Sequence, residues 1–177
     1  MLSIDAIAEL YRDVMDFPRE GIVFKDVTTV LTHPGALGDA VTHLLSMLED
    51  IQFDAVAAIE SRGFMFGGVI ADRLSIPLVL IRKPGKLPGD VHSCDYTLEY
   101  GTGTVEMHRD SLPRGFRVLI VDDLIATGGT ALAAAELLRM DGSVPVAAGF
   151  LMDLRFLEGA KKVEAAGVPV RSLVKLD

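Results

Sequence analysis

The chain has 177 residues, half of them apolar, which suits one α/β domain with a substantial core. Its 17 basic and 25 acidic residues give a formal charge of −8, which argues against a nucleic-acid-binding protein because such proteins need a basic face. Cys94 is the only cysteine, so an intrachain disulfide is excluded, and the four histidines show no metal-ligand spacing. No apolar run is long enough to cross a bilayer, and residues 1–17 do not resemble a signal peptide. We therefore expect a cytoplasmic protein that does not bind a membrane.

In the first part of the chain, apolar residues recur at helical spacing from Ser3 to Met15, and Pro18 and Gly21 end this predicted helix. Residues 22–27 have no clear periodicity. A second helix is predicted after Pro34.

From residue 54 on, short apolar runs alternate with helical segments. Strands are predicted at 54–59, 77–81, 117–121, 144–152 and 168–174, and helices at 64–74, 129–140 and 158–166. Continuous apolar strands separated by helices indicate a parallel sheet covered on both faces. Residues 82–96 interrupt the alternation with lysine, arginine, glycine and proline, and predict a long irregular loop that is either functional or disordered.

The most informative motif is VLIVDDLIATGGT, residues 118–130. A predicted strand leads into Asp122 and Asp123, and a short loop then reaches two glycines and the threonine that opens a helix. Ligands of open parallel sheets bind at the carboxyl ends of the strands, so the position itself predicts a site.

The residue types of this motif favour a phosphate monoester. Gly128 and Gly129 allow the backbone to approach an anion, free N–H groups at the helix start point toward it, and Thr127 and Thr130 add hydroxyl donors. The helix dipole contributes only about 0.3–1 kcal/mol, so the hydrogen bonds supply most of the affinity. The two aspartates suit a vicinal diol or a cation carried by the ligand. The motif lacks GxxxxGK[ST] and is not a Walker P-loop; an acidic turn followed by a helix cap is the alternative.

The motif resembles the phosphoribosyl-diphosphate-binding motif of type I phosphoribosyltransferases. Four further segments resemble the adenine-specific members of that family in the family's order: GIVFKD (21–26), ESRGF (60–64), RKPGKLPG (82–89) and LEYG (98–101). The resemblance covers nearly the whole chain. It implies an α/β fold of the type I phosphoribosyltransferase kind, in which a twisted, mainly parallel sheet is flanked by helices. It also implies a single domain (1–177) with an N-terminal hood (1–33) and a mobile catalytic loop (about 82–103).

The same resemblance assigns the two phosphate-bearing parts of the substrate. It implies that Asp122 and Asp123 face the ribose hydroxyls, and that the ribose 5-phosphate is cradled by Ala126, Thr127, Gly128, Gly129 and Thr130. It places the diphosphate against Ser61, Arg62, Gly63, Arg82, Lys83 and Lys86, with Arg62 counted as catalytic. In this family part of the loop charge serves the neighbouring subunit, which implies a homodimer. From the residues alone, Arg62 could equally pair with Glu60 at the surface, and loop lysines are often merely solubilising.

For the base, Glu99 matches the glutamate that the family places beside the purine, where it can exchange a proton with the base. Val23, Phe24 and Lys25 match the hood over the base, and Tyr100 is assigned to the same pocket. The alternatives are a solvated Glu99 and a core Phe24. Many family members carry arginine at the position of Lys25, which leaves the role of that residue open.

The implied reaction belongs to purine salvage: adenine and phosphoribosyl diphosphate give AMP and diphosphate. We expect Mg²⁺ to be bound mainly through the substrate, with contacts to Asp122 and Asp123 mediated by water rather than direct protein ligation. Two alternatives are a transferase for another purine base and a non-catalytic sensor of phosphoribosyl diphosphate. The charge of −8 speaks against a sensor that also binds nucleic acid.

Overall fold

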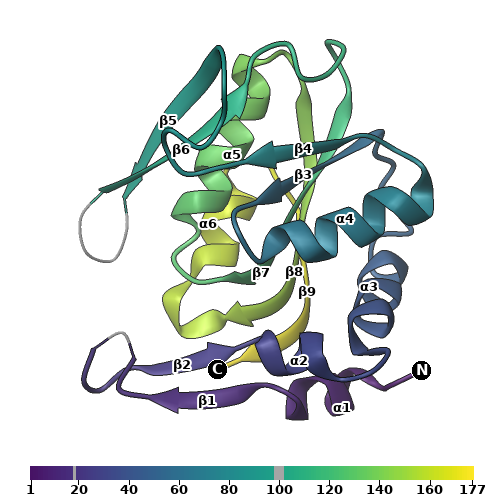
Figure 1. Cartoon of the computed structure of the whole chain (residues 1–177), viewed down its shortest axis with the longest axis vertical. Helices are drawn as coiled ribbons and strands as arrows, with labels where there is room; N and C mark the ends of the chain where they lie inside the picture. Colours follow the sequence, from purple (N-terminus) through teal and green to yellow (C-terminus); the bar gives the residue numbers. More distant parts are fainter. Residues whose placement is uncertain (18, 98–101) are drawn as a thin grey trace.

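The computed structural model describes residues 1–17, 19–97 and 102–177. At its centre lies a parallel sheet with the strand order β4-β3-β7-β8-β9, flanked by helices on both faces (Figure 1). The strands are β3 (Ala55–Ile59), β4 (Leu78–Ile81), β7 (Arg117–Ile125), β8 (Val144–Leu154) and β9 (Val170–Leu176). All five correspond to predicted strands, so the predicted parallel α/β sheet is confirmed.

The helices cover the two faces because the sheet strands are apolar on both sides. On β7, Val118 and Ile120 belong to one buried cluster, whereas Leu119 and Val121 belong to the other. The first cluster is covered by α5 (Gly129–Met140) and α6 (Gly159–Ala165), and the second by α1 (Ile4–Glu9), α3 (Ala36–Ser46) and α4 (Gly63–Leu74).

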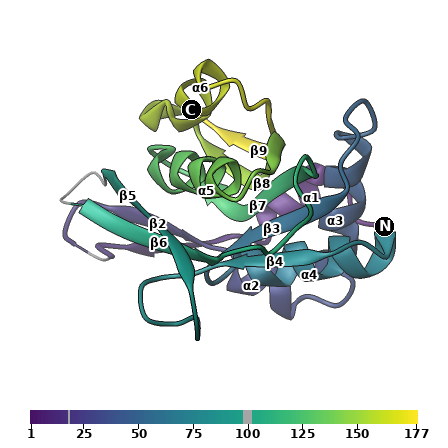
Figure 2. The same ribbon diagram turned by 90° about the horizontal axis from the view of Figure 1, so that it is seen from above.

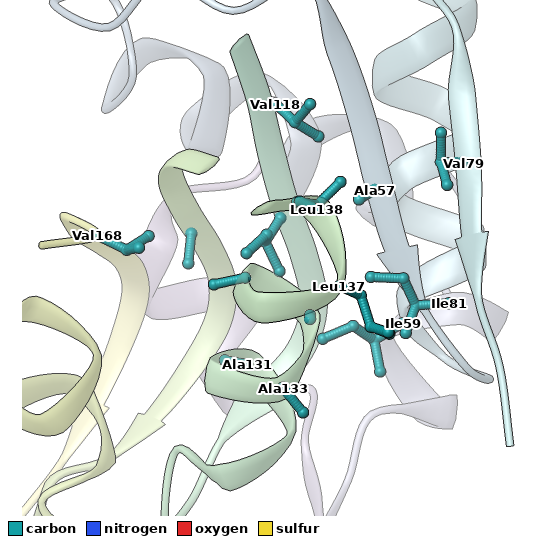
Figure 3. Close-up of a cluster of buried hydrophobic side chains, with 14 of the residues drawn as sticks. Ala57, Ile59, Val79, Ile81, Val118, Ala131, Ala133, Leu137, Leu138 and Val168 are labelled. Atoms are coloured by element: carbon teal, nitrogen blue, oxygen red, sulfur yellow. The ribbon is translucent and has the colours of Figure 1, made fainter. Parts of the chain in front are cut away.

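Figure 3 shows the first cluster, in which Leu137 and Leu138 of α5 lie against Ile59, Ile81 and Val118 of three neighbouring strands. The helix α5 is therefore held to the sheet along its length, and its N-terminus is fixed at the carboxyl end of β7. No helix in the described ranges is long and apolar enough to span a bilayer.

The N-terminal region differs from the prediction of one helix from Ser3 to Met15. The helix α1 ends at Glu9, and β1 (Arg12–Met15) pairs antiparallel with β2 (Val23–Asp26). Cross-strand ion pairs explain the difference: Arg12 contacts Asp26 at 2.5 Å and Lys25 contacts Asp13 at 2.6 Å. The short helix α2 (Thr28–Thr32), which the sequence analysis did not predict, follows β2.

The predicted irregular loop is also partly wrong. Residues 82–90 contain no strand or helix, but β5 (Val91–Thr97) begins at Val91 and pairs antiparallel with β6 (Thr102–His108). The strand is held by distant contacts, because Cys94 and Tyr96 pack against the core cluster under α5. In both Figure 1 and Figure 2, the β5–β6 and β1–β2 hairpins extend from the same side of the central sheet.

Candidate functional site

The two aspartates of the motif lie within β7 and not after it. The strand was predicted to end at Val121, but Leu124 and Ile125 still pair with β8, through Met152 and Asp153. The loop that follows is therefore only three residues long, from 126 to 128, before α5 begins. The carboxylates and the start of α5 are consequently held on rigid elements.

The loop and the start of α5 form a cradle next to the carboxylates. The residues from Asp122 to Ala131 line a cavity of about 160 Å³ together with Arg62. The first N–H groups of α5 have no acceptor within the helix and are available to an anion. The cradle thus contains all five residues that were predicted to hold the ribose phosphate.

Gly128 is required in this cradle for two reasons. Its φ of +82° lies in the left-handed region, and a Cβ at this position would come 2.7 Å from the carbonyl oxygen of Gly159. Gly159 in turn packs so closely on Ala126 that a Cβ there would overlap the Ala126 carbonyl oxygen. The sequence analysis missed Gly159, because its partner lies more than thirty residues away along the chain.

A second cavity of about 180 Å³ adjoins the cradle and is lined by Glu60, Ser61, Arg62, Lys83, Asp122 and Asp123. Arg62, Asp122 and Asp123 line both cavities. The turn from β3 to α4 brings Ser61 and Arg62 here, and the Glu60–Ser61 peptide bond is cis. A Cβ on Gly63 would lie 2.6 Å from the Val121 carbonyl oxygen, so this turn presses directly on β7.

Arg62 pairs with Asp123 and not with Glu60. Its Nε donates to Asp123 Oδ2 at 2.5 Å, and the Asp123 side chain is only 4% exposed. The backbone N–H of Asp123 donates to Asp122 Oδ1 at 2.8 Å. Burial, followed by the negative charge of Asp123, holds the pKa of Asp122 well above its usual range. The two carboxyl groups are thus well placed to bind the hydroxyls of a sugar.

Of the three loop cations that were predicted to bind diphosphate, only Lys83 lines a site cavity. Arg82 donates through Nε to Glu60 Oε2 at 3.1 Å, and its Nη1 donates to the Lys86 carbonyl oxygen at 3.0 Å. The pKa of Glu60 is lowered, first by the backbone N–H of Lys83 and then by Arg82. Glu60 therefore anchors the start of the loop to the site, a role that the sequence analysis did not assign. The Lys86 side chain is exposed.

The β1–β2 hairpin brings Phe24 to the site. Its ring lies 5.5 Å from Arg62 Cζ and packs edge-on against Phe17 with ring centroids 5.2 Å apart. Phe24 is half-buried and belongs to neither core cluster, so the core alternative does not apply. Lys25 is engaged with Asp13, and Val23 is exposed. Successive strand residues point to opposite faces, which separates Lys25 from Phe24.

Two residues assigned to the base, Glu99 and Tyr100, lie outside the described residues. Within the described ranges, no group of three or more histidine, cysteine, aspartate or glutamate side chains could hold a metal ion. The arrangement offers an anion cradle, a polar cavity with cationic side chains, a carboxylate pair between them and an aromatic ring at the edge.

The chain is similar to known phosphoribosyltransferases. A family model described as phosphoribosyl transferase domain matches residues 27–163. The adenine phosphoribosyltransferase of Methylobacterium nodulans is 49% identical over 175 residues, which cover 99% of this chain and 97% of that protein.

Solved structures agree. The crystal structure of adenine phosphoribosyltransferase from Thermoanaerobacter pseudethanolicus superposes with a TM-score of 0.94 at 44% identity, covering 98% of this chain and all of that one. The enzyme from Saccharomyces cerevisiae, complexed with adenine and an imino-altritol bisphosphate, has a TM-score of 0.87 at 36% identity and covers 96% of this chain and 97% of that chain.

Proposed function

The chain belongs to the adenine phosphoribosyltransferase family, and we propose that it transfers the phosphoribosyl group of phosphoribosyl diphosphate to adenine, giving AMP and diphosphate in purine salvage. One observation carries the proposal: an anion cradle and a second polar cavity share Arg62, Asp122 and Asp123. A sugar with a phosphate at one end and a diphosphate at the other matches two such neighbouring cavities. In this arrangement the carboxylates meet the ribose.

In the reaction, the base nitrogen forms a bond to the anomeric carbon while the bond from that carbon to the diphosphate oxygen breaks. Positive charge develops on the ribose and negative charge on the leaving diphosphate. Asp123, which is paired with Arg62, lies on the ribose side, and Arg62 and Lys83 line the cavity for the leaving group. These residues stabilise the separating charges electrostatically, and Asp123 and Arg62 need little reorganisation because they stand on β7 and on the β3–α4 turn.

The proton that adenine loses from the attacking nitrogen goes to Glu99 in this proposal. General base assistance of this kind contributes about 10²–10⁴-fold in rate. Tyr100 next to it and Phe24 of the hairpin are proposed to line the base pocket, and the ring of Phe24 near Arg62 supports that placement. Lys25 is proposed to hold the hairpin through Asp13 rather than to contact the base.

We propose that magnesium enters on the diphosphate, whose charge it neutralises. The residues present fit this role. Asp123 already accepts a hydrogen bond from Arg62, and Asp122 accepts one from the backbone N–H of Asp123. Within the described residues, no cluster of three possible metal ligands competes for the ion. Magnesium commonly keeps several waters and binds substrate phosphates, so Asp122 and Asp123 would act through its water shell.

A product assay tests the function. Magnesium and phosphoribosyl diphosphate are supplied with adenine, hypoxanthine, guanine or orotate, each separately. We expect AMP from adenine, with the other bases at least a hundredfold slower. Faster turnover of another base would support phosphoribosyl transfer at this site but refute adenine as the substrate. Saturable binding of phosphoribosyl diphosphate without turnover of any base would indicate a sensor.

The contribution of the hairpin is tested by Phe24→Leu, with Phe156→Leu as the matched control because Phe156 is an exposed phenylalanine outside the site. We expect the first variant to raise KM for adenine several-fold with little change in KM for phosphoribosyl diphosphate. The control variant keeps both values. Equal kinetics of the two variants would remove Phe24 from the base pocket.

A homodimer is proposed as the working form. Met65 and Leu74 of α4 and Leu78 and Leu80 of the adjacent edge strand β4 are exposed, and exposed apolar residues on two neighbouring elements favour association. Sedimentation equilibrium should give the dimer mass for the parent protein and a lower mass for Leu78→Lys. A monomeric parent would refute the proposal.

We also propose a cytoplasmic location, which cell fractionation tests.

A further inference from the structure

A third cavity, of about 160 Å³, lies between α6 and the ends of β8 and β9. None of its lining residues lines either cavity of the candidate site. Its polar lining includes Asp153, Arg155, Lys161, Glu164, Ser172 and Lys175. A space of this size accommodates a small ion with a few water molecules.

Asp153 is the buried carboxylate of this lining. The residue is only 6% exposed, and its Oδ1 accepts no hydrogen bond from any residue in the described ranges. Burial raises the pKa of Asp153, although Arg155 and Lys175 lower it. A buried carboxyl oxygen without a donor is unfavourable, so this atom is suited to a partner from outside the chain.

The charges around the cavity favour a cation as that partner. Two of the lining cations are already neutralised, since Arg155 pairs with Asp177 at 3.0 Å and Lys161 pairs with Glu158 at 2.7 Å. The remaining charged residues of the lining are Asp153, Glu164 and Lys175, which leaves one negative charge in excess.

The oxygen atoms that the lining offers indicate whether the ion is monovalent or divalent. Ser172, which is also buried, belongs to this lining and adds a hydroxyl oxygen. A divalent metal prefers several carboxylates or histidines, and the described part of the chain holds no such group of three. A single positive charge balances the excess, and its weak hydration shell is partly replaced by the carboxyl and hydroxyl oxygens.

We propose that this cavity binds a monovalent cation of potassium or ammonium size, with Asp153 Oδ1 as its principal ligand. The site has a structural route to the phosphate cradle. Glu158 and Ala160 line the cavity, and Gly159 between them packs on Ala126 and Gly128. An occupied site therefore stabilises the start of α6 against the cradle. The effect on catalysis rests on the proposed function, but binding of the cation does not.

Thermal unfolding without adenine or phosphoribosyl diphosphate tests the site. At constant ionic strength, we expect a Tm about 2–4 °C higher in potassium or ammonium chloride than in tetramethylammonium chloride, with a saturable dependence on cation concentration. Asp153→Asn should lose this difference. Asp50→Asn is the control, because that exposed carboxyl and its partner Arg171 do not line the cavity, and it should keep the difference.

The other outcomes overturn the proposal. The same Tm in all three salts means that the cavity holds water only. A cation effect that survives in Asp153→Asn places the cation elsewhere. A saturable shift with inorganic phosphate at fixed potassium, lost in Lys175→Ala, makes it an anion site. Where the Tm shift is present, a lower KM for phosphoribosyl diphosphate in potassium supports the connection through Gly159, and an unchanged KM refutes that connection alone.

Discussion

Replacement of Gly128 by alanine tests the geometry of the phosphate cradle. The substitution has two costs. A non-glycine residue at φ +82° is strained by about 1–2 kcal/mol. The new Cβ would also lie 2.7 Å from the Gly159 carbonyl oxygen, about 0.7 Å inside ordinary contact, and overpacking of this kind costs about 1–3 kcal/mol.

Gly115→Ala separates the two costs. Gly115 has φ +83° with nothing within 4 Å of the added Cβ, so it has the backbone strain without the clash. In urea unfolding we expect Gly128→Ala to lose about 1–3 kcal/mol more than Gly115→Ala. Because the Gly128 clash displaces the cradle, KM for phosphoribosyl diphosphate should rise at least tenfold in that variant only. Equal destabilisation of the two variants with unchanged KM would refute the reasoning.

Three further predictions concern the turn after β3, the hairpin and the base. Gly63→Ala should lower Tm and activity because the added Cβ would clash with the Val121 carbonyl oxygen. The control is Gly68→Ala in the same helix, where the added Cβ has open space and should raise the stability by about 0.5–1 kcal/mol. A higher stability of both variants would contradict the close packing at Gly63. Asp26 has a folded pKa of about 2, below its ordinary 3.8, because of hydrogen bonds from Thr28 and then Arg12. Its contribution, about 1 kcal/mol after allowance for solvent screening, is present above pH 4 and lost as the pH falls toward 2. Stability should therefore fall less steeply over this range in Asp26→Asn, and parallel curves would exclude the effect. Glu99→Gln should lower turnover at least tenfold with little change in calorimetric binding of phosphoribosyl diphosphate; near-parental turnover would remove Glu99 from the mechanism.

The sheet and the phosphate cradle could be predicted because their signals are local. A run of apolar residues such as 118–121 is buried on both faces wherever a parallel sheet forms, and two glycines at the start of a helix leave its N–H groups accessible to an anion. The boundaries were less certain, since β7 continues to Ile125 through its pairing with β8. How far a strand continues depends on the neighbour with which it pairs, and that neighbour is distant in sequence.

The N-terminal hairpin shows why a local pattern can mislead. Residues from Ser3 to Met15 have apolar positions at helical spacing, but only the first half is helical. The pairing of Arg12 with Asp26 and of Lys25 with Asp13 stabilises a strand instead. The intrinsic preference for a helix is worth only a few tenths of a kcal/mol per residue. It is outweighed by the backbone pairing of β1 with β2 together with these ion pairs.

By itself, the sequence determined the α/β class, the location of the ligand site at the end of β7 and the family, because these depend on residue type and spacing along the chain. Only the tertiary structure decided which partners those residues take. Arg62 pairs with Asp123, 61 positions away along the chain. Glu60 accepts hydrogen bonds from the Arg82 side chain and from the backbone N–H of Lys83. Gly159 supports the cradle from another helix. An ion pair or a close backbone contact forms between groups that folding brings together. The residues around each group in the sequence do not predict which distant group will be its partner.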